Sequence, residues 1–178
     1  MTRYDRPAVR LLINPLAPRG YMNTIFLDID GVLNNYLWLE NAGSNLHPDD
    51  NVRQENIVRF NRLVDTIDYK IVITSTWRIG KSLGFFHELF RKHGIHGEVV
   101  GMTAEHGRSR FTQISDWMDL TILDRYLIID DDDVFDGLRS MPSMRRIATD
   151  HFIHTNKFIG LSEDDVDNAI FLAKEVFP

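Results

Sequence analysis

Two aspartates, Asp28 and Asp30, lie two residues apart where an apolar run gives way to Gly31. Residues i and i+2 of a strand share a face, and two buried like charges are unfavourable unless a cation, a proton or a phosphoryl group lies between them. The same residues also suit a strand end followed by a turn, because Asp and Gly are common turn residues. The pair alone supports a site and an ordinary turn about equally.

Other polar side chains follow other apolar blocks of the sequence. Thr74, Ser75 and Arg78 follow a second block, and four aspartates that begin with Asp130 and Asp131 follow a third. If these blocks are parallel strands, their carboxyl ends meet at the edge where ligands bind in open α/β sheets. The joint pattern therefore favours a site over an isolated turn.

These residue types suit phosphoryl transfer to a carboxylate, which needs a nucleophile, an acid, a cation and hydrogen-bond donors. We expect Asp28 to attack phosphorus and form an aspartyl phosphate. Asp30 would protonate the leaving group and then activate water. Thr74 would donate its hydroxyl to a phosphoryl oxygen, and Arg110 is the best candidate for the missing cationic side chain.

The acidic residues also suit a magnesium site. Mg²⁺ prefers oxygen ligands and keeps several waters, so one or two carboxylates suffice. We expect the ligands to be Asp28, the backbone carbonyl of Asp30 and one of Asp130 and Asp131. The net charge of −6 agrees with a divalent cation and argues against an extended surface for duplex nucleic acid, but not against a single-stranded end.

Four further residues are predicted to bind substrate, namely Ser75, Arg78, Gly31 and Trp38. Trp38 and Tyr36 belong to a polar and aromatic connection at about residues 34–50, which we interpret as a flap over the site. Aromatic rings stack on bases in single-strand sites, although packing the flap down is their commoner role. Arg78 equally suits contact with a distal phosphate, solvent exposure or pairing with a carboxylate.

Five apolar blocks predict buried strands at residues 25–29, 70–74, 98–102, 126–130 and, more weakly, 146–149. Their continuous apolar character is typical of parallel strands covered on both faces. Apolar residues at spacings of three and four predict helices near residues 57–67, 83–90 and 114–118, and a capping box at residues 162–165 begins a last one. Alternating strands and helices predict an α/β fold with a doubly wound parallel sheet.

The chain of 178 residues suits one domain, which we place at residues 22–178. Residues 1–21 are expected to be a disordered leader or an extra edge strand, because three prolines interrupt them. The sequence contains no cysteine, which excludes disulfides and cysteine nucleophiles. It also lacks a membrane-spanning apolar stretch and a secretory leader, so we expect a cytoplasmic protein without a membrane partner.

The aspartate motifs resemble those of haloacid dehalogenase (HAD) superfamily phosphohydrolases. Residues 26–34, 71–75 and 127–131 are similar to motifs I, II and IV of that superfamily, in the same order. A closer resemblance, to the HAD domain of bacterial and phage RNA-repair proteins, rests on residues 74–78, 110–117, 149–150 and 160–162. The layout also resembles 5'(3')-deoxyribonucleotidases and the phosphatase half of polynucleotide kinase-phosphatases.

This resemblance implies a HAD-like fold with a minimal cap and a Mg²⁺-dependent phosphomonoesterase that uses an aspartyl phosphate. It also implies that the substrate is a phosphorylated small molecule, a nucleotide or a nucleic-acid end. The superfamily usually has lysine at motif III, whereas here Arg110 aligns and Arg108 is close enough to compete. By family position, Asp131 is favoured over Asp130 as the metal ligand.

Two alternatives would give a phosphate-binding module without turnover. A receiver-like domain also uses aspartates and a threonine, but receivers place the phosphoacceptor after a later strand and a lysine after the last one. Neither feature is found in this sequence. A HAD-like domain that has lost turnover is the other alternative, and the intact Asp28 and Asp30 argue against it.

Overall fold

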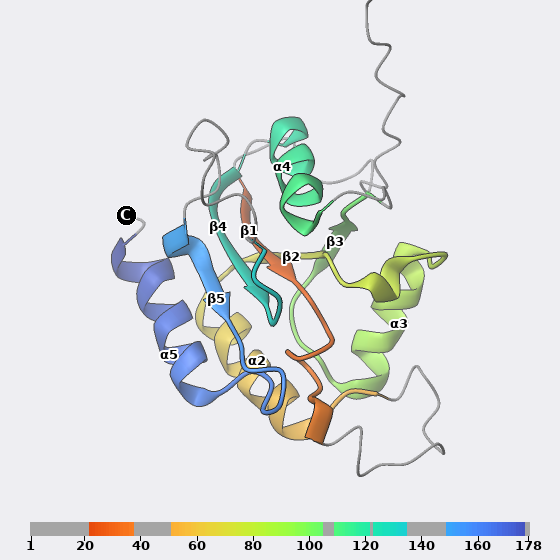
Figure 1. Ribbon diagram of the computed structural model, residues 1–178, viewed down its shortest axis with the longest axis vertical. Coiled ribbons are helices and arrows are strands. Elements are labelled where there is room, and N and C mark those ends of the chain that lie inside the picture. The colour runs from red at the N-terminus through yellow and green to blue at the C-terminus, as the bar shows by residue number, and fades with distance from the viewer. Residues whose placement is uncertain (1–21, 38–50, 105–108, 122, 135–148, 177–178) are drawn as a thin grey trace, which may run out of the picture.

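The computed structural model describes residues 22–37, 51–104, 109–121, 123–134 and 149–176. Within them, five strands form a parallel sheet in the order β3-β2-β1-β4-β5 (Figure 1). The strands are β1 (Met22–Leu27), β2 (Lys70–Ile73), β3 (Val99–Met102), β4 (Leu123–Asp130) and β5 (Phe152–His154). This architecture confirms the predicted α/β fold with a doubly wound parallel sheet.

Helices cover both faces of the sheet. They are α2 (Gln54–Thr66), α3 (Leu83–His93), α4 (Arg110–Leu120) and α5 (Glu163–Phe171), with short helical turns at Thr76–Arg78, Thr149–His151 and Leu172–Val176. Figure 1 shows α2 beside α5, and α4 apart from them at the other face. All four predicted helices are confirmed, and the capping box of α5 forms between Ser162 and Asp165.

The strands are largely apolar, as expected when successive side chains point to opposite covered faces. In β1, Ile25 and Leu27 belong to the apolar cluster that also contains the buried residues of α2, α3 and α5. Phe26, between them, belongs to a second cluster with Ile114 and Trp117 of α4. Both faces of β1 are therefore buried, and polar residues such as Asp28 and Thr74 directly follow the strand ends.

The fifth strand differs from the prediction at residues 146–149. Residues 146–148 lie outside the described residues, Thr149 begins a helical turn, and β5 is Phe152–His154. This edge strand pairs with residues Ile128 to Asp130 of β4. Only its central residue, Ile153, is buried. A three-residue edge strand between two histidines carries too short an apolar run to be recognised in the sequence.

Two predicted segments lie outside the described residues. They are the leader or edge strand at residues 1–21 and most of the flap, from residue 38 onward. No helix in the described part of the chain is both long and apolar enough to span a bilayer. The connection between β2 and β3 holds only the turn Thr76–Arg78 and helix α3, as expected for a minimal cap.

Candidate active site

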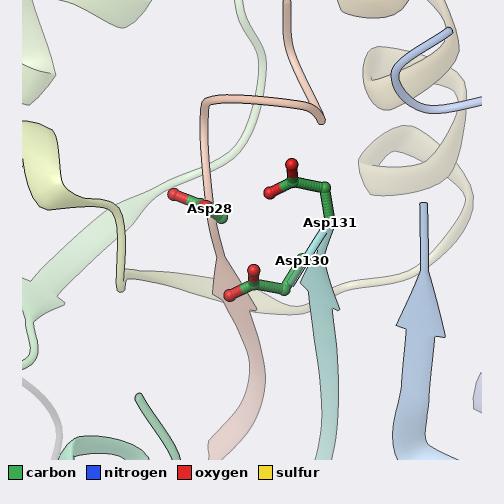
Figure 2. A group of neighbouring side chains, drawn as sticks. All are labelled: Asp28, Asp130 and Asp131. Carbon is green, nitrogen blue, oxygen red and sulfur yellow. The ribbon is translucent and has the colours of Figure 1, made fainter. Parts of the chain in front are cut away.

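Three carboxylates gather at the carboxyl ends of two neighbouring strands. Asp28 directly follows β1, Asp130 ends β4, and Asp131 is the next residue (Figure 2). One oxygen from each of the three lies within 4.8 Å of the others. Because the chain winds outward from β1 to β2 and returns through β4 on the other side, this point is the topological switch of the sheet, where ligands bind.

Burial disfavours the ionised form of the three carboxyl groups. Asp28 is 4% exposed and Asp130 fully buried. Desolvation is the largest cause that raises the pKa of Asp28, against the opposing Arg110 charge. Desolvation and then the Asp28 charge raise the pKa of Asp130 to about 8 and that of Asp131 to about 6. A divalent cation among these hard oxygen donors would offset the repulsion, so the residues fit a magnesium site.

Arg110 brings a guanidinium into the cluster from the first turn of α4. Its Nη1 donates to Asp130 Oδ2 at 2.7 Å and to Thr74 Oγ1 at 3.2 Å, and it lies 3.4 Å from Asp28 Oδ2. The Ser109 hydroxyl caps α4 and so fixes where the helix begins. The structure therefore brings Arg110 together with three predicted site residues, whereas Arg108 lies outside the described residues.

Asp30 is held separately, by two residues that sequence reasoning gave no role. The Trp77 indole Nε1 donates to Asp30 Oδ2 at 2.9 Å, and Asn34 Nδ2 donates to Asp30 Oδ1 at 2.8 Å. Asn34 is itself fixed, because its Oδ1 accepts from the Gly31 N–H at 2.9 Å and its Nδ2 also donates to the Asn51 carbonyl. Both carboxylate oxygens of Asp30 are thus oriented.

Gly31, predicted to bind substrate, shapes the carboxylate cluster. Its φ is 66°, and a Cβ at this position would overlap the Asp131 carboxyl group. The Thr155 hydroxyl donates to the Gly31 carbonyl at 2.8 Å, which ties the turn to the loop after β5. Only glycine fits here, since it adopts a positive φ freely and leaves room for Asp131.

The structure contradicts one of the three surroundings predicted for Arg78, exposure to solvent. Arg78 is only 3% exposed. Its guanidinium donates to the carbonyls of Thr74, Ser75, Thr103 and Ala104 and to the Gln113 side chain. Five donors in one plane match this set of acceptors at the ends of β2 and β3, so Arg78 positions the loop after β2.

The remaining predicted substrate residues lie at different depths. Ser75 is fully buried, and its hydroxyl accepts from the Trp77 N–H at the start of a helical turn. Trp38 lies outside the described residues. Tyr36 is 43% exposed, and its ring is 6.3 Å from that of Phe158. Desolvation and then the Asp131 charge raise the pKa of Tyr36, so its hydroxyl lies within electrostatic reach of the cluster.

The missed residues had only weak sequence signals. Trp77 and Asn34 stand inside the segments that carry the aspartate and threonine motifs, but their partners depend on folding. Trp77 and Asp30 are 47 residues apart in the chain. Nothing in local periodicity or turn chemistry indicates such a contact.

Comparison with known proteins bears on the resemblance found in the sequence. A family model described as the HAD domain in Swiss Army Knife RNA repair proteins matches residues 24–166, a segment that contains the whole cluster. A search of curated proteins gives no match. The matched segment covers most of the chain, and its parallel sheet agrees with the superfamily's fold. The chain therefore belongs to the family of HAD domains in Swiss Army Knife RNA repair proteins.

Proposed function

We propose that the chain is a Mg²⁺-dependent phosphomonoesterase that forms an aspartyl phosphate and acts on a nucleotide or a nucleic-acid terminal phosphate. The observation that carries this proposal is the contrast between two aspartates only two residues apart. Asp28 is buried beside Arg110 and two further carboxylates, whereas Asp30 is hydrogen-bonded to Trp77 outside that cluster. Different surroundings for two carboxyl groups are typical of a nucleophile and an acid–base pair.

In the proposed reaction, a carboxylate oxygen of Asp28 attacks phosphorus, and the bond between phosphorus and the leaving oxygen breaks. The leaving oxygen takes a proton from Asp30. Asp30 then removes a proton from water as the water oxygen attacks the aspartyl phosphate, which releases inorganic phosphate and restores Asp28. Because hydrogen bonds hold Asp30 from both sides, its carboxyl group keeps one orientation for both proton transfers.

Arg110 and Thr74 are the proposed donors to the transferred phosphoryl group. The Arg110 guanidinium already lies near both Asp28 and the Thr74 hydroxyl, so an oxygen bound beside Asp28 would be within reach of either donor. A guanidinium presents several N–H groups in a plane and forks onto phosphate oxygens. It therefore suits the motif III position that lysine usually occupies.

Mg²⁺ would be held by Asp28, Asp131 and the backbone carbonyl of Asp30. Asp130 is the less suitable of the two neighbouring aspartates, because Arg110 donates to it at 2.7 Å. When bound, the cation would neutralise charge on the transferred phosphoryl group. It would also favour the ionised form of Asp28, whose pKa burial otherwise raises.

The substrate class is supported by two observations. The matched family is named for RNA repair proteins, which agrees with a nucleic-acid strand end as the substrate. The short connection between β2 and β3 leaves the site without a large cap domain, as suits a substrate with an accessible end.

The test is hydrolysis of an aryl phosphate, mononucleotides and end-phosphorylated oligonucleotides with Mg²⁺ or with EDTA. We expect Asp28→Asn to lower kcat at least about 1,000-fold. Asp132→Asn is the matched control, since its side chain is exposed and only its backbone N–H contacts Asp130. Turnover that persists in Asp28→Asn or in EDTA would overturn the mechanism. Oligonucleotides hydrolysed no better than mononucleotides would overturn the strand-end substrate.

The non-catalytic alternative is separated by the same assay. Phosphate binding without turnover by the wild-type chain would favour a binding module. A receiver-like fold is inconsistent with the sheet, because receivers have the strand order 2-1-3-4-5, whereas this sheet has β3-β2-β1-β4-β5.

A further inference from the structure

A cavity of about 410 Å³ is lined by Asp30 but not by Asp130 or Asp131. Its lining residues come from the loop after β1, the segment before α2, the segment between β2 and α3, and the first turn of α3; they are Asp30, Asn51, Thr76, Trp77, Ile79, Lys81 and Phe85. A volume of this size falls in the range of small-ligand sites, roughly 300 to 1,000 Å³. It could hold one nucleotide but not several.

The walls of this cavity combine apolar surface with one cation. Ile79 lines the cavity and is 60% exposed, so it offers apolar surface to a ligand. Lys81 Nζ lies 4.5 Å from the centre of the Phe85 ring. Among the described residues, Lys81 makes no ion pair, so its charge is open to an anion. This is a cationic spot in a chain whose net charge is −6.

Asp30 connects the cavity to the proposed chemistry, and the inference therefore rests on the proposed function. A leaving oxygen that takes a proton from Asp30 must lie within hydrogen-bond reach of it. The body of the leaving group is attached to that oxygen, and among the described residues this cavity has Asp30 in its wall. The cavity is therefore a suitable place for the leaving group.

We propose that this cavity binds a leaving nucleoside that carries a second phosphate. The base would lie against the Trp77 and Phe85 rings, and Lys81 would pair with the second phosphate. Aromatic rings accept any base by stacking, and a lysine on the rim attracts a phosphate. The second phosphate has two sources, a free nucleoside bisphosphate or the phosphodiester next to the terminal nucleotide of a strand.

The proposed contact between Lys81 and the second phosphate is tested with Lys81→Gln. The two substrates are a nucleoside 3',5'-bisphosphate and the matching nucleoside monophosphate. We expect the ratio of kcat/KM for the bisphosphate to that for the monophosphate to fall about fivefold, mainly through KM. Lys81→Arg should restore part of the ratio. Lys92→Gln, at an exposed lysine at the other end of α3, is the matched control and should leave the ratio unchanged. An unchanged ratio in Lys81→Gln would overturn the proposal.

The proposed contact between the base and the aromatic rings is tested with Phe85→Leu. Phe85 is chosen over Trp77 because Trp77 also donates a hydrogen bond to Asp30. We expect KM for nucleoside phosphates to rise about fivefold or more relative to KM for ribose 5-phosphate. Equal losses on both substrates would mean that Phe85 acts only through folding and would remove the base from the proposal. A thermal unfolding scan of each variant identifies loss of stability.

The failure of this inference is distinguishable from failure of the proposed function. If the wild-type chain hydrolyses no phosphomonoester, the proposed function is wrong. Calorimetric titration of Asp28→Asn with the bisphosphate and the monophosphate then tests whether the cavity binds the second phosphate. Tighter binding of the bisphosphate than of the monophosphate, lost in Lys81→Gln, would support it; equal binding would overturn it. An end-phosphorylated dinucleotide preferred over the free bisphosphate would identify the strand end as the source of the second phosphate.

Discussion

At the residue scale, Asp28 and Asp30 differ in their surroundings, although they are only two residues apart in the sequence. Asp28 is 4% exposed and faces Arg110, while the two oxygens of Asp30 accept from an indole and an amide. Sequence reasoning could propose different roles for the two residues because the residue types and the Asp-x-Asp spacing are local. It could not find the Trp77 contact, because Trp77 lies 47 residues from Asp30 in the chain. Asn34 contacts Asp30 within the same turn, but its residue type alone did not distinguish this contact from an ordinary turn.

The hydrogen bond from Trp77 gives a prediction about Asp30. Trp77→Phe removes the indole N–H that contacts Asp30 but keeps an aromatic side chain. We expect kcat to fall about tenfold with a small change in KM, because the acid–base carboxyl group loses one of its two orienting donors. Steady-state kinetics with an aryl phosphate provide the measurement.

The control for Trp77 is a second tryptophan of the same chain. Trp117 is buried, and its Nε1 has no hydrogen-bond partner among the described residues. Trp117→Phe should therefore leave kcat within about twofold of wild type, although it changes the core. A kcat for Trp77→Phe as high as that of Trp117→Phe would show that the indole does not position Asp30.

A glycine at the site gives a second prediction at this scale. Gly31→Ala places a Cβ onto the Asp131 carboxyl group and also strains a backbone with φ 66°. We expect the Mg²⁺ concentration for half-maximal activity to rise about tenfold or more, because Asp131 must move away from the cluster. Gly94→Ala is the control, since φ there is 65° and nothing lies within 4 Å of the added carbon. It should lose about 1 kcal/mol of stability with unchanged Mg²⁺ dependence; equal Mg²⁺ dependence in both variants would contradict this role.

At the scale of elements, the sequence predicted four of the five strands and all four helices because each carries its own pattern. The apolar blocks that form β1 to β4 are buried on both faces, so their patterns are strong. The edge strand β5 buries only Ile153, and its position was not recognised. The burial of Arg78 was missed for a related reason, since two of its carbonyl partners, Thr103 and Ala104, lie 25 and 26 residues away in the chain.

The loop after β5 holds the aspartate loop from outside the sheet. The Thr155 hydroxyl donates to the Gly31 carbonyl, Asn35 donates to the Ile159 carbonyl, and the Leu161 N–H donates to the Val32 carbonyl. These contacts join segments more than 120 residues apart. The two loops therefore form one unit at the edge of the site.

This loop contact predicts a stability effect. Thr155→Val keeps the shape of a buried side chain but removes its hydrogen bond to the Gly31 carbonyl. We expect a loss of about 1 to 3 kcal/mol, because that carbonyl stays buried without its donor. Urea unfolding provides the measurement. Thr66→Val, which removes the hydrogen bond of an exposed helix threonine, should change stability by less than about 1 kcal/mol. Equal losses in the two variants would mean that the buried hydrogen bond to Gly31 stabilises the fold no more than an exposed one.

At the scale of the whole molecule, the three carboxyl groups of the site make the free energy of unfolding depend on pH. Without metal, burial raises the pKa of Asp131 to about 6 and that of Asp130 to about 8, both above the ordinary 3.8. A carboxyl group with a raised pKa binds its proton more tightly in the folded chain than in the unfolded chain. Its contribution to stability is therefore complete below pH 3.8 and is lost as pH rises through about 6 and then about 8.

We therefore expect the metal-free protein to unfold at a lower temperature near pH 8 than near pH 6, by at least about 2 to 4 °C. Mg²⁺ should restore more stability at the higher pH, since only ionised carboxylates bind it. Thermal unfolding in EDTA and in Mg²⁺ measures both effects. Asp130→Asn should weaken the pH dependence, because Asp130 is the group that loses its proton between these pH values. Asp68→Asn, at a side chain 97% exposed, should not. Metal-free stability that stays level or rises between these pH values would contradict the charge repulsion inferred for the cluster.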